Sequence, residues 1–148
     1  MMNPLLFENM PPFIKREMEK ITEQIQPLMK KNSKYVMFAF PLMIVGGFNL
    51  LLTFFDGGVG FDQLLVPSIY ALITAIGIAL YKESKHVNKQ IHRIGKEHMI
   101  ERIETSSIIA DDKKNAYINM VKKQSKMSLQ IFINFLTEEN KQKQNMYL

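Results

Sequence analysis

The sequence predicts an all-α membrane protein, in which a two-helix transmembrane hairpin carries a small cytoplasmic helical bundle formed by the N-terminal helix and the C-terminal tail. Three observations lead to this fold class. Apolar residues are concentrated in one block, because no Lys or Arg occurs between Lys34 and Lys82 in a chain of 148 residues. Glycines and aspartates divide that block near its middle. The flanks are rich in charge, and their apolar residues recur at helical spacing.

Residues 1–34 are predicted to form a cytoplasmic amphipathic helix followed by a basic flank. Pro11 and Pro12 suit a helix start. The helix is expected over residues 11–26, because Pro27 interrupts it directly after this range. Acidic and basic residues alternate outside its apolar stripe, which favours packing against protein over lying on anionic lipid. The stripe has 4-3-4-3 spacing and consists of Ile14, Met18, Ile21, Ile25 and Leu28, of which the first four are the candidate partner face.

The apolar block is predicted to cross a membrane twice. A helix rises about 1.5 Å per residue, so it needs about 20 apolar residues to cross roughly 30 Å of hydrocarbon. Residues 35–55 and 63–81 meet this requirement, and the glycine-rich segment 56–62 is predicted to be the outer turn. Residues 35–81 are therefore expected to form an antiparallel transmembrane hairpin with its turn centred near Val59.

Basic residues at the ends of the spans predict the orientation of the hairpin. None lies in the turn, and cytoplasmic flanks of spans carry excess Lys and Arg, so both termini are expected on the cytoplasmic side of the plasma membrane. The same residues are expected to attract anionic lipid headgroups. They are Lys30, Lys31, Lys34, Lys82, Lys85, Lys89 and Arg93. Binding of nucleic acid is disfavoured, because the cluster lacks interleaved aromatic residues.

Small and polar residues within the spans are predicted to mediate helix packing in the membrane. They are Gly46, Gly47, Ala71, Ala75, Ala79 and Asn49. Packing within the hairpin is favoured over a dimerisation face, and the Asn49 amide is expected to hydrogen-bond Thr74 or a second copy of the chain. Neither span contains a charged residue, so the sequence does not support an ion pathway or a proton relay.

Residues 82–148 are predicted to form a cytoplasmic helical region. The second span is expected to continue into this region with a bend at Gly95, followed by helices that start at Asp111 or Asp112 and near Ser128. The last helix has an apolar face of Leu129, Phe132, Ile133 and Leu136. A region of this size is near the lower limit for folding alone, so we expect help from the N-terminal helix, a second copy or the membrane.

No residue pattern indicates catalysis. His86, His92 and His98 are six residues apart, so successive rings point about 120° apart on a helix and cannot share a metal ion. Phosphate-binding loops and nucleophile elbows are absent from the sequence, and the lack of cysteine excludes disulfides and thiolate chemistry. We therefore expect no enzyme activity, no cofactor and no small-molecule substrate.

Four stretches of the chain resemble an uncharacterised family of small two-span membrane proteins from Bacillus-type bacteria, known as a domain of unknown function. They are MPPFIKREMEK at residues 10–20, KESKHVNKQ at 82–90, IADDKKNAYINMVKK at 109–123 and LQIFINFLTEEN at 129–140. The resemblance implies a bacterial plasma-membrane protein and supplies neither a catalytic residue nor a substrate.

The apolar stripes of the two cytoplasmic regions suggest a function. We expect these helices to mediate protein–protein association or scaffolding at the inner leaflet, with a protein partner or with a second copy of the chain. An alternative is an accessory subunit of a membrane transporter or enzyme that acts through its spans. A pore former of the holin kind is disfavoured by the long helical tail and by spans that lack a polar face.

Overall fold

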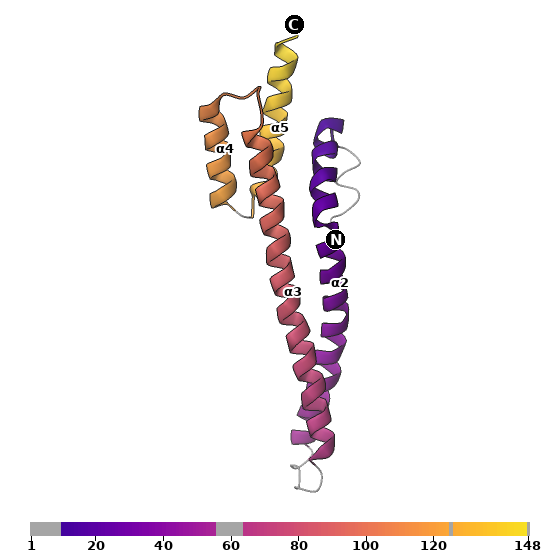
Figure 1. Cartoon of the computed structure of the whole chain (residues 1–148). Coiled ribbons are helices and arrows are strands. Elements are labelled where there is room, and N and C mark those ends of the chain that lie inside the picture. The colour runs from indigo at the N-terminus through magenta and orange to yellow at the C-terminus, as the bar shows by residue number, and fades with distance from the viewer. Residues whose placement is uncertain (1–9, 56–63, 125, 148) are drawn as a thin grey trace. The chain divides into compact units, whose positions relative to one another are not determined.

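The computed structural model describes residues 10–55, 64–124 and 126–147. These residues form four helices, namely α2 (Pro12–Phe55), α3 (Leu65–Glu104), α4 (Asp111–Lys123) and α5 (Ser128–Asn145) (Figure 1). The all-α class is confirmed, with two long apolar helices and two shorter polar ones. The chain divides into two compact units: unit 1 contains the described residues up to Gln26 and from His92 onward, and unit 2 is Pro27–Ile91.

Helix α2 is a single helix of 44 residues, and it continues through Pro27 and Pro41. It begins at Pro12, in agreement with the expected start, because a proline costs no hydrogen bond in the first turn. The prediction that Pro27 ends the helix is wrong. Proline removes one backbone hydrogen bond, but the helix is held in place just beyond it, where the Ser84 hydroxyl of α3 donates to Oδ1 of Asn32 at 2.7 Å.

Helix α3 is 40 residues long and shows no break at Gly95. A Cβ atom at Gly95 would lie 3.9 Å from Cγ2 of Ile21, so this glycine is packed against α2 within unit 1. The helix is therefore continuous through Gly95, and an added Cβ atom there would make ordinary van der Waals contact with Ile21. The predicted outer turn at 56–62 and Gln63, the first residue of the predicted second span, lie outside the described residues.

Unit 1 has an apolar core to which all four helices contribute. Its buried apolar residues are Ile14, Met18, Ile21, Ile25, Met99, Ile103, Ile109, Ile118, Val121, Ile131, Phe132, Phe135 and Leu136. The rings of Phe132 and Phe135 are stacked with centroids 6.5 Å apart, and Tyr117 packs edge-on against Phe135 at 5.5 Å. The contact between Tyr117 and Phe135 joins α4 to α5.

Helix α4 begins at Asp111, one of the two predicted starts, and α5 begins at Ser128, with Met127 rather than Ser128 at the N-cap position. In α4 the acidic residues Asp111 and Asp112 occupy the first turn and basic residues the last. This arrangement complements the helix dipole. The sequence predicted the start of α4 at Asp111 or Asp112 and made no prediction of its end.

In unit 2 the apolar parts of α2 and α3 pack antiparallel. A Cβ atom added at Gly46 of α2 would lie 2.8 Å from the backbone nitrogen of Thr74 and 3.0 Å from the carbonyl oxygen of Tyr70. A Cβ atom added at Gly77 of α3 would lie 2.9 Å from the backbone nitrogen of Met43. These contacts match a register centred near residue 59, and each glycine allows the opposite backbone to approach.

Candidate functional site

The most prominent surface feature of unit 2 is a set of exposed apolar side chains, which we name the apolar belt. It consists of Val36, Met37, Phe38, Phe40, Ile44, Val45, Phe48, Leu51, Leu52, Phe54 and Phe55 of α2, and of Leu65, Val66, Ile69, Leu72, Ile76, Ile78 and Tyr81 of α3. In the most apolar windows of α2 and α3, only 11% and 6% of the residues are buried. Both helices are long and apolar enough to span a membrane, and the helices of a soluble core would be covered.

The small residues of the spans fall on two different faces. Gly46 and Gly77 lie between the two helices, as does Ala39, which is buried. Gly77 is absent from the set predicted from the sequence. The three predicted alanines of α3, Ala71, Ala75 and Ala79, are exposed and lie outside the contact between the helices. Helical spacing identified a stripe of alanines, but not which side of α3 faces α2.

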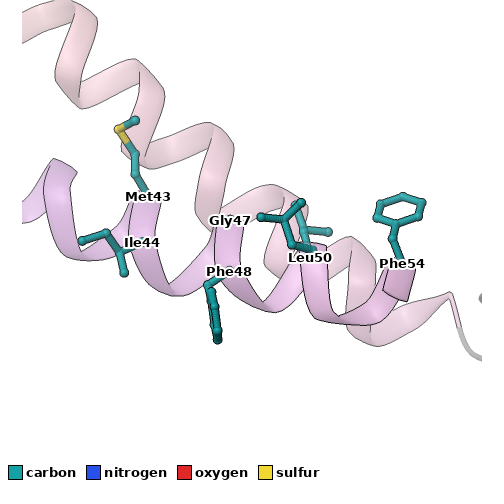
Figure 2. Close-up of a pocket in the computed structure, with 7 residues that line it drawn as sticks. Met43, Ile44, Gly47, Phe48, Leu50 and Phe54 are labelled. Carbon is teal, nitrogen blue, oxygen red and sulfur yellow. The ribbon is translucent and has the colours of Figure 1, made fainter. Parts of the chain in front are cut away.

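Gly47 adjoins Gly46 but faces open space, since a Cβ atom there would meet nothing within 4 Å. It lies in a shallow groove of about 570 Å³ on α2 (Figure 2). The groove is lined by Met43, Ile44, Gly47, Phe48, Leu50, Leu51 and Phe54. An apolar groove of this kind can receive another apolar chain and offers no polar group for chemistry.

The Asn49 amide is satisfied within its own helix. Its Nδ2 donates to the carbonyl oxygen of Val45 at 2.7 Å. The Thr74 hydroxyl donates to the carbonyl oxygen of Tyr70 at 2.8 Å, so the expected hydrogen bond between Asn49 and Thr74 is not formed. Local hydrogen bonds to the preceding turn of the helix are a common solution for polar side chains in apolar helices.

The seven basic residues predicted to flank the spans are all exposed. They are Lys30, Lys31, Lys34, Lys82, Lys85, Lys89 and Arg93. The ammonium nitrogen of Lys31 lies 5.6 Å from the centre of the Tyr35 ring, within range of a cation–π contact. Arg93, which belongs to unit 1, forms an exposed ion pair with Glu97 at 3.7 Å.

The residues predicted as a partner face are mostly in the core of unit 1. Ile14, Met18, Ile21 and Ile25 are 2–8% exposed, and Phe132 and Leu136 are 0% and 2% exposed. Leu129 and Ile133 are half-buried. The apolar stripes of the N-terminal and C-terminal segments are thus covered within the same chain, and a partner has access to other surfaces only.

An ion-pair cluster lies within unit 1 and joins three helices. Arg102 of α3 donates to both carboxylate oxygens of Glu139 of α5, with distances of 3.2 Å for Nη1 and 2.6 Å for Nη2. Its Nε lies 3.5 Å from Oε2 of Glu17 of α2. Lys20 donates to the other oxygen of Glu17 at 2.9 Å. The side chains of Glu17 and Glu139 are each 11% exposed, so these charges interact with little screening by water.

Ser106 completes this cluster in the connection between α3 and α4. Its hydroxyl donates to Oε1 of Glu139 and accepts from the backbone nitrogen of Ile108 at 3.4 Å. Its carbonyl oxygen accepts from Nζ of Lys114 at 3.1 Å. Hydrogen bonds from one residue therefore tie the end of α3 to both α4 and α5.

The cluster shifts the pKa values of its members. Burial alone would raise the pKa of Glu17, but the hydrogen bond from Lys20 and the charge of Arg102 outweigh it and hold that pKa below its usual value. Burial would also lower the pKa of Arg102, yet the hydrogen bonds and charge of Glu139 raise it. The charged forms of both groups are thus stabilised by folding.

A second polar contact joins α4 to α5. Glu138 accepts hydrogen bonds from Lys113 at 2.5 Å and from the Tyr117 hydroxyl at 2.7 Å. These bonds lower the pKa of Glu138. Burial, followed by the hydrogen bond and charge of Glu138, raises the pKa of Tyr117 to about 12. Both effects favour the protonated phenol and the ionised carboxylate that the contact needs.

The sequence interpretation missed the cluster of Glu17, Arg102 and Glu139, although a signal was present. Glu17 follows Ile14 by three residues and precedes Ile21 by four, so it lies on the apolar stripe of its helix. Glu139 follows Leu136 by three residues in the same way. A carboxylate that interrupts an apolar stripe requires a buried cationic partner.

The histidines do not converge. Gln90 contacts Nε2 of His86 at 3.0 Å, whereas the buried Nε2 of His98 has no hydrogen-bond partner among the described residues. Within the same residues, no group of three or more His, Asp or Glu side chains is placed to hold a metal ion.

Comparison with known proteins gives two findings. The model of a family of unknown function, DUF5392, matches residues 6–144. The chain is similar to the uncharacterized protein YwnF of Bacillus subtilis (strain 168), with 37% identity over 142 residues that cover 96% of this chain and 98% of the relative. No solved structure matches the chain significantly.

Proposed function

The chain belongs to the family of unknown function DUF5392, and from this premise we propose that it is a non-catalytic integral membrane protein that associates with other protein at the inner leaflet. In this proposal α2 and α3 cross the plasma membrane as a hairpin, and both termini are cytoplasmic. Unit 1 forms the cytoplasmic bundle through which the protein contacts a partner or a second copy of itself.

The apolar belt of unit 2 is the observation that carries the proposal. A half-exposed large apolar side chain costs about 1 kcal/mol in water, so the whole belt costs on the order of 20 kcal/mol. The unfolded chain exposes the same side chains, so this figure is the free energy that an apolar covering of the belt would contribute. A covering of acyl chains removes the cost, whereas water does not.

The charge distribution supports the cytoplasmic location of the termini. The basic residues precede the apolar belt on α2 and follow it on α3, so in an antiparallel hairpin they lie at the same end. The positive-inside rule assigns that end to the cytoplasm. Unit 1 is continuous in sequence with this end through α2 and α3, so the rule also assigns unit 1 to the cytoplasm.

Association through unit 1 requires a surface other than its buried stripes. Met120 of α4 and Met127, next to the start of α5, are 46% and 55% exposed. They are separated by the short connection between the two helices, in which the Met127 backbone nitrogen donates to the carbonyl of Gln124. Flexible methionine side chains adapt readily to the surfaces of partners.

Accessibility of introduced cysteines tests the membrane topology. The chain has no cysteine, so a single cysteine introduced at Gly58, between the spans, or at Ser107, between α3 and α4, is the one site that a maleimide can label. Its labelling shows on which side of the membrane that position lies. In intact cells a membrane-impermeant maleimide should label Gly58→Cys and leave Ser107→Cys unlabelled until the cells are opened. Labelling of Ser107→Cys from outside, or recovery of the protein in the soluble fraction, would contradict the two-span topology.

Charge substitutions on α4 and at the start of α5 test association. In-cell crosslinking should capture a neighbouring protein or a second copy with the native chain, and the double variant Met120→Glu, Met127→Glu should lose it. The double variant Asn115→Glu, Asn119→Glu adds equal charge to exposed positions of α4 and is the matched control. Equal capture by both variants would refute association through this surface.

The groove at Gly47 favours a second candidate, an accessory subunit that binds a larger membrane protein through its spans. Gly47→Leu adds an apolar side chain to the groove and places its Cβ atom in open space, because nothing lies within 4 Å of that atom. Loss of a co-purifying membrane protein in Gly47→Leu, with the methionine variants unaffected, would favour this candidate over association through unit 1.

A further inference from the structure

A band of lysines lies on unit 2 directly beyond the apolar belt. It consists of Lys30, Lys31, Lys34, Lys82, Lys85 and Lys89, and we name it the lysine band. Segments 27–34 and 82–91, which contain it, hold one acidic residue, Glu83. All six lysines are exposed, and none has a carboxylate within ion-pair distance among the described residues.

Contacts between α2 and α3 hold the two halves of the band side by side. The hydrogen bond between Ser84 and Asn32, at 2.7 Å, lies within the band, and Val87 is 1% exposed. The three lysines of α3, at 82, 85 and 89, recur at steps of three and four residues and therefore share one helix face. At about 100° per residue, that face points away from Ser84 and Val87 and thus away from α2.

Given the proposed membrane location, we propose that the lysine band binds the headgroups of anionic phospholipids and keeps these lipids around the hairpin. The charges are complementary, and the band is continuous with the apolar belt that acyl chains would cover. The lysine stems are long enough to follow apolar surface while the ammonium groups reach phosphates. Lys31, with its ammonium 5.6 Å from the centre of the Tyr35 ring, is held at this boundary.

The net charge of the headgroup is the feature that the band selects. Phosphatidylcholine, a zwitterionic lipid, presents its phosphate beside a quaternary amine, which six ammonium groups repel. A phosphatidylglycerol headgroup has no such amine. Each lysine near an anionic membrane surface contributes about a fivefold preference, the equivalent of ~1 kcal/mol.

Lipid selectivity in nanodiscs tests the proposal. The full chain is placed in phosphatidylcholine discs that contain a trace of spin-labelled phosphatidylglycerol or spin-labelled phosphatidylcholine, and the immobilised fraction of each label gives the selectivity ratio. We expect the native chain to prefer phosphatidylglycerol at least about fivefold at low salt. In 1 M salt, where the screening length is about 3 Å, the ratio should approach one.

Two triple variants separate the lysine band from net charge. Lys82→Gln, Lys85→Gln, Lys89→Gln should lower the ratio at least about fivefold, and the preference that remains is that of Lys30, Lys31 and Lys34. The matched control is Lys126→Gln, Lys141→Gln, Lys143→Gln, which removes the same charge from exposed positions of unit 1 and should keep the native ratio. Equal ratios in native chain and band variant, or equal loss in the control, overturn the proposal.

The remaining outcomes are distinguishable. A chain that never co-elutes with discs of any composition overturns the proposed membrane function and this inference with it. A chain that enters the discs but shows no lipid preference overturns this inference alone. Retention of a DNA duplex that depends on the band, without lipid preference, would assign the band to nucleic acid and also overturn it.

Discussion

Gly46 and Gly47 of α2 are adjacent in sequence, but Gly46 packs against α3 and Gly47 faces open space. Replacing each by alanine therefore tests the same substitution in a packed and in an open environment. Gly46→Ala places a Cβ atom 2.8 Å from the backbone nitrogen of Thr74 and in closer contact with its hydroxyl oxygen. Gly47→Ala places the same atom in open space. Both variants gain helix propensity of about 1 kcal/mol, so this contribution cancels in the comparison.

The expected difference follows from the clash at Gly46. Backbone atoms cannot rotate away, so the Cβ atom must push α2 and α3 apart by several tenths of an ångström. Overpacking of this kind costs about 1–3 kcal/mol, which is therefore the predicted deficit of Gly46→Ala relative to Gly47→Ala. Gly47→Ala itself should be as stable as the native chain or more stable.

Unfolding in detergent micelles provides the measurement. Helix content is followed by circular dichroism as a denaturing detergent is titrated, and a cysteine pair at Asn32 and Ser84 reports by disulfide formation whether the hairpin is closed. Gly46→Ala should unfold at a lower detergent fraction and crosslink more slowly than Gly47→Ala. Equal behaviour of the two variants would refute the close approach of α2 to α3 at Gly46.

Two further predictions concern the ion-pair cluster of unit 1. Arg102→Leu removes the guanidinium from both carboxylates and leaves Glu139 buried with only the Ser106 hydroxyl and Glu17 with only Lys20. The variant should be destabilised by about 3 kcal/mol in urea unfolding, near the lower end for broken buried pairs because the Arg102 side chain is 26% exposed. Arg93→Leu removes an exposed pair with Glu97 and should cost under about 1 kcal/mol; a similar cost for both variants would contradict the role of the cluster. Because folding lowers the pKa of Glu17 from 4.5, its stabilisation is complete above about pH 4.5 and is lost as the pH falls through the folded pKa. The native chain should therefore lose stability more steeply in acid than Glu17→Gln does, and parallel curves in urea unfolding at a series of pH values would show that Glu17 is not stabilised.

Local sequence rules located the starts of α2, α4 and α5 but failed at Pro27. The rule that proline ends a helix considers one lost hydrogen bond. In the folded chain the residues on both sides of Pro27 are held by packing, through Ile25 in unit 1 and Asn32 in unit 2. These contacts join residues distant in the sequence, which is why the local rule gave the wrong result.

The same limit applies to the candidate site. Periodicity correctly identified the apolar stripes that include Ile21 and Phe132, but a stripe does not reveal what covers it. The stripes were interpreted as a partner face, whereas the structure covers them with other helices of the chain. Arg102 and Glu139 are 37 positions apart in the sequence, so no local spacing predicts their contact. The signal in the sequence was the position of Glu17 and Glu139 on the apolar stripes of their helices.

The hydrogen bonds of Ser106 have a consequence for how this family can diverge. Ser106 lies in the short stretch from Thr105 to Ala110 and forms three hydrogen bonds. Its hydroxyl donates to Glu139 and accepts from the backbone nitrogen of Ile108, and its carbonyl oxygen accepts from Lys114. Inserting or deleting a residue there would withdraw all three at once. We therefore expect members of the family to keep the length of this stretch, whereas the identities of nearby surface residues should vary.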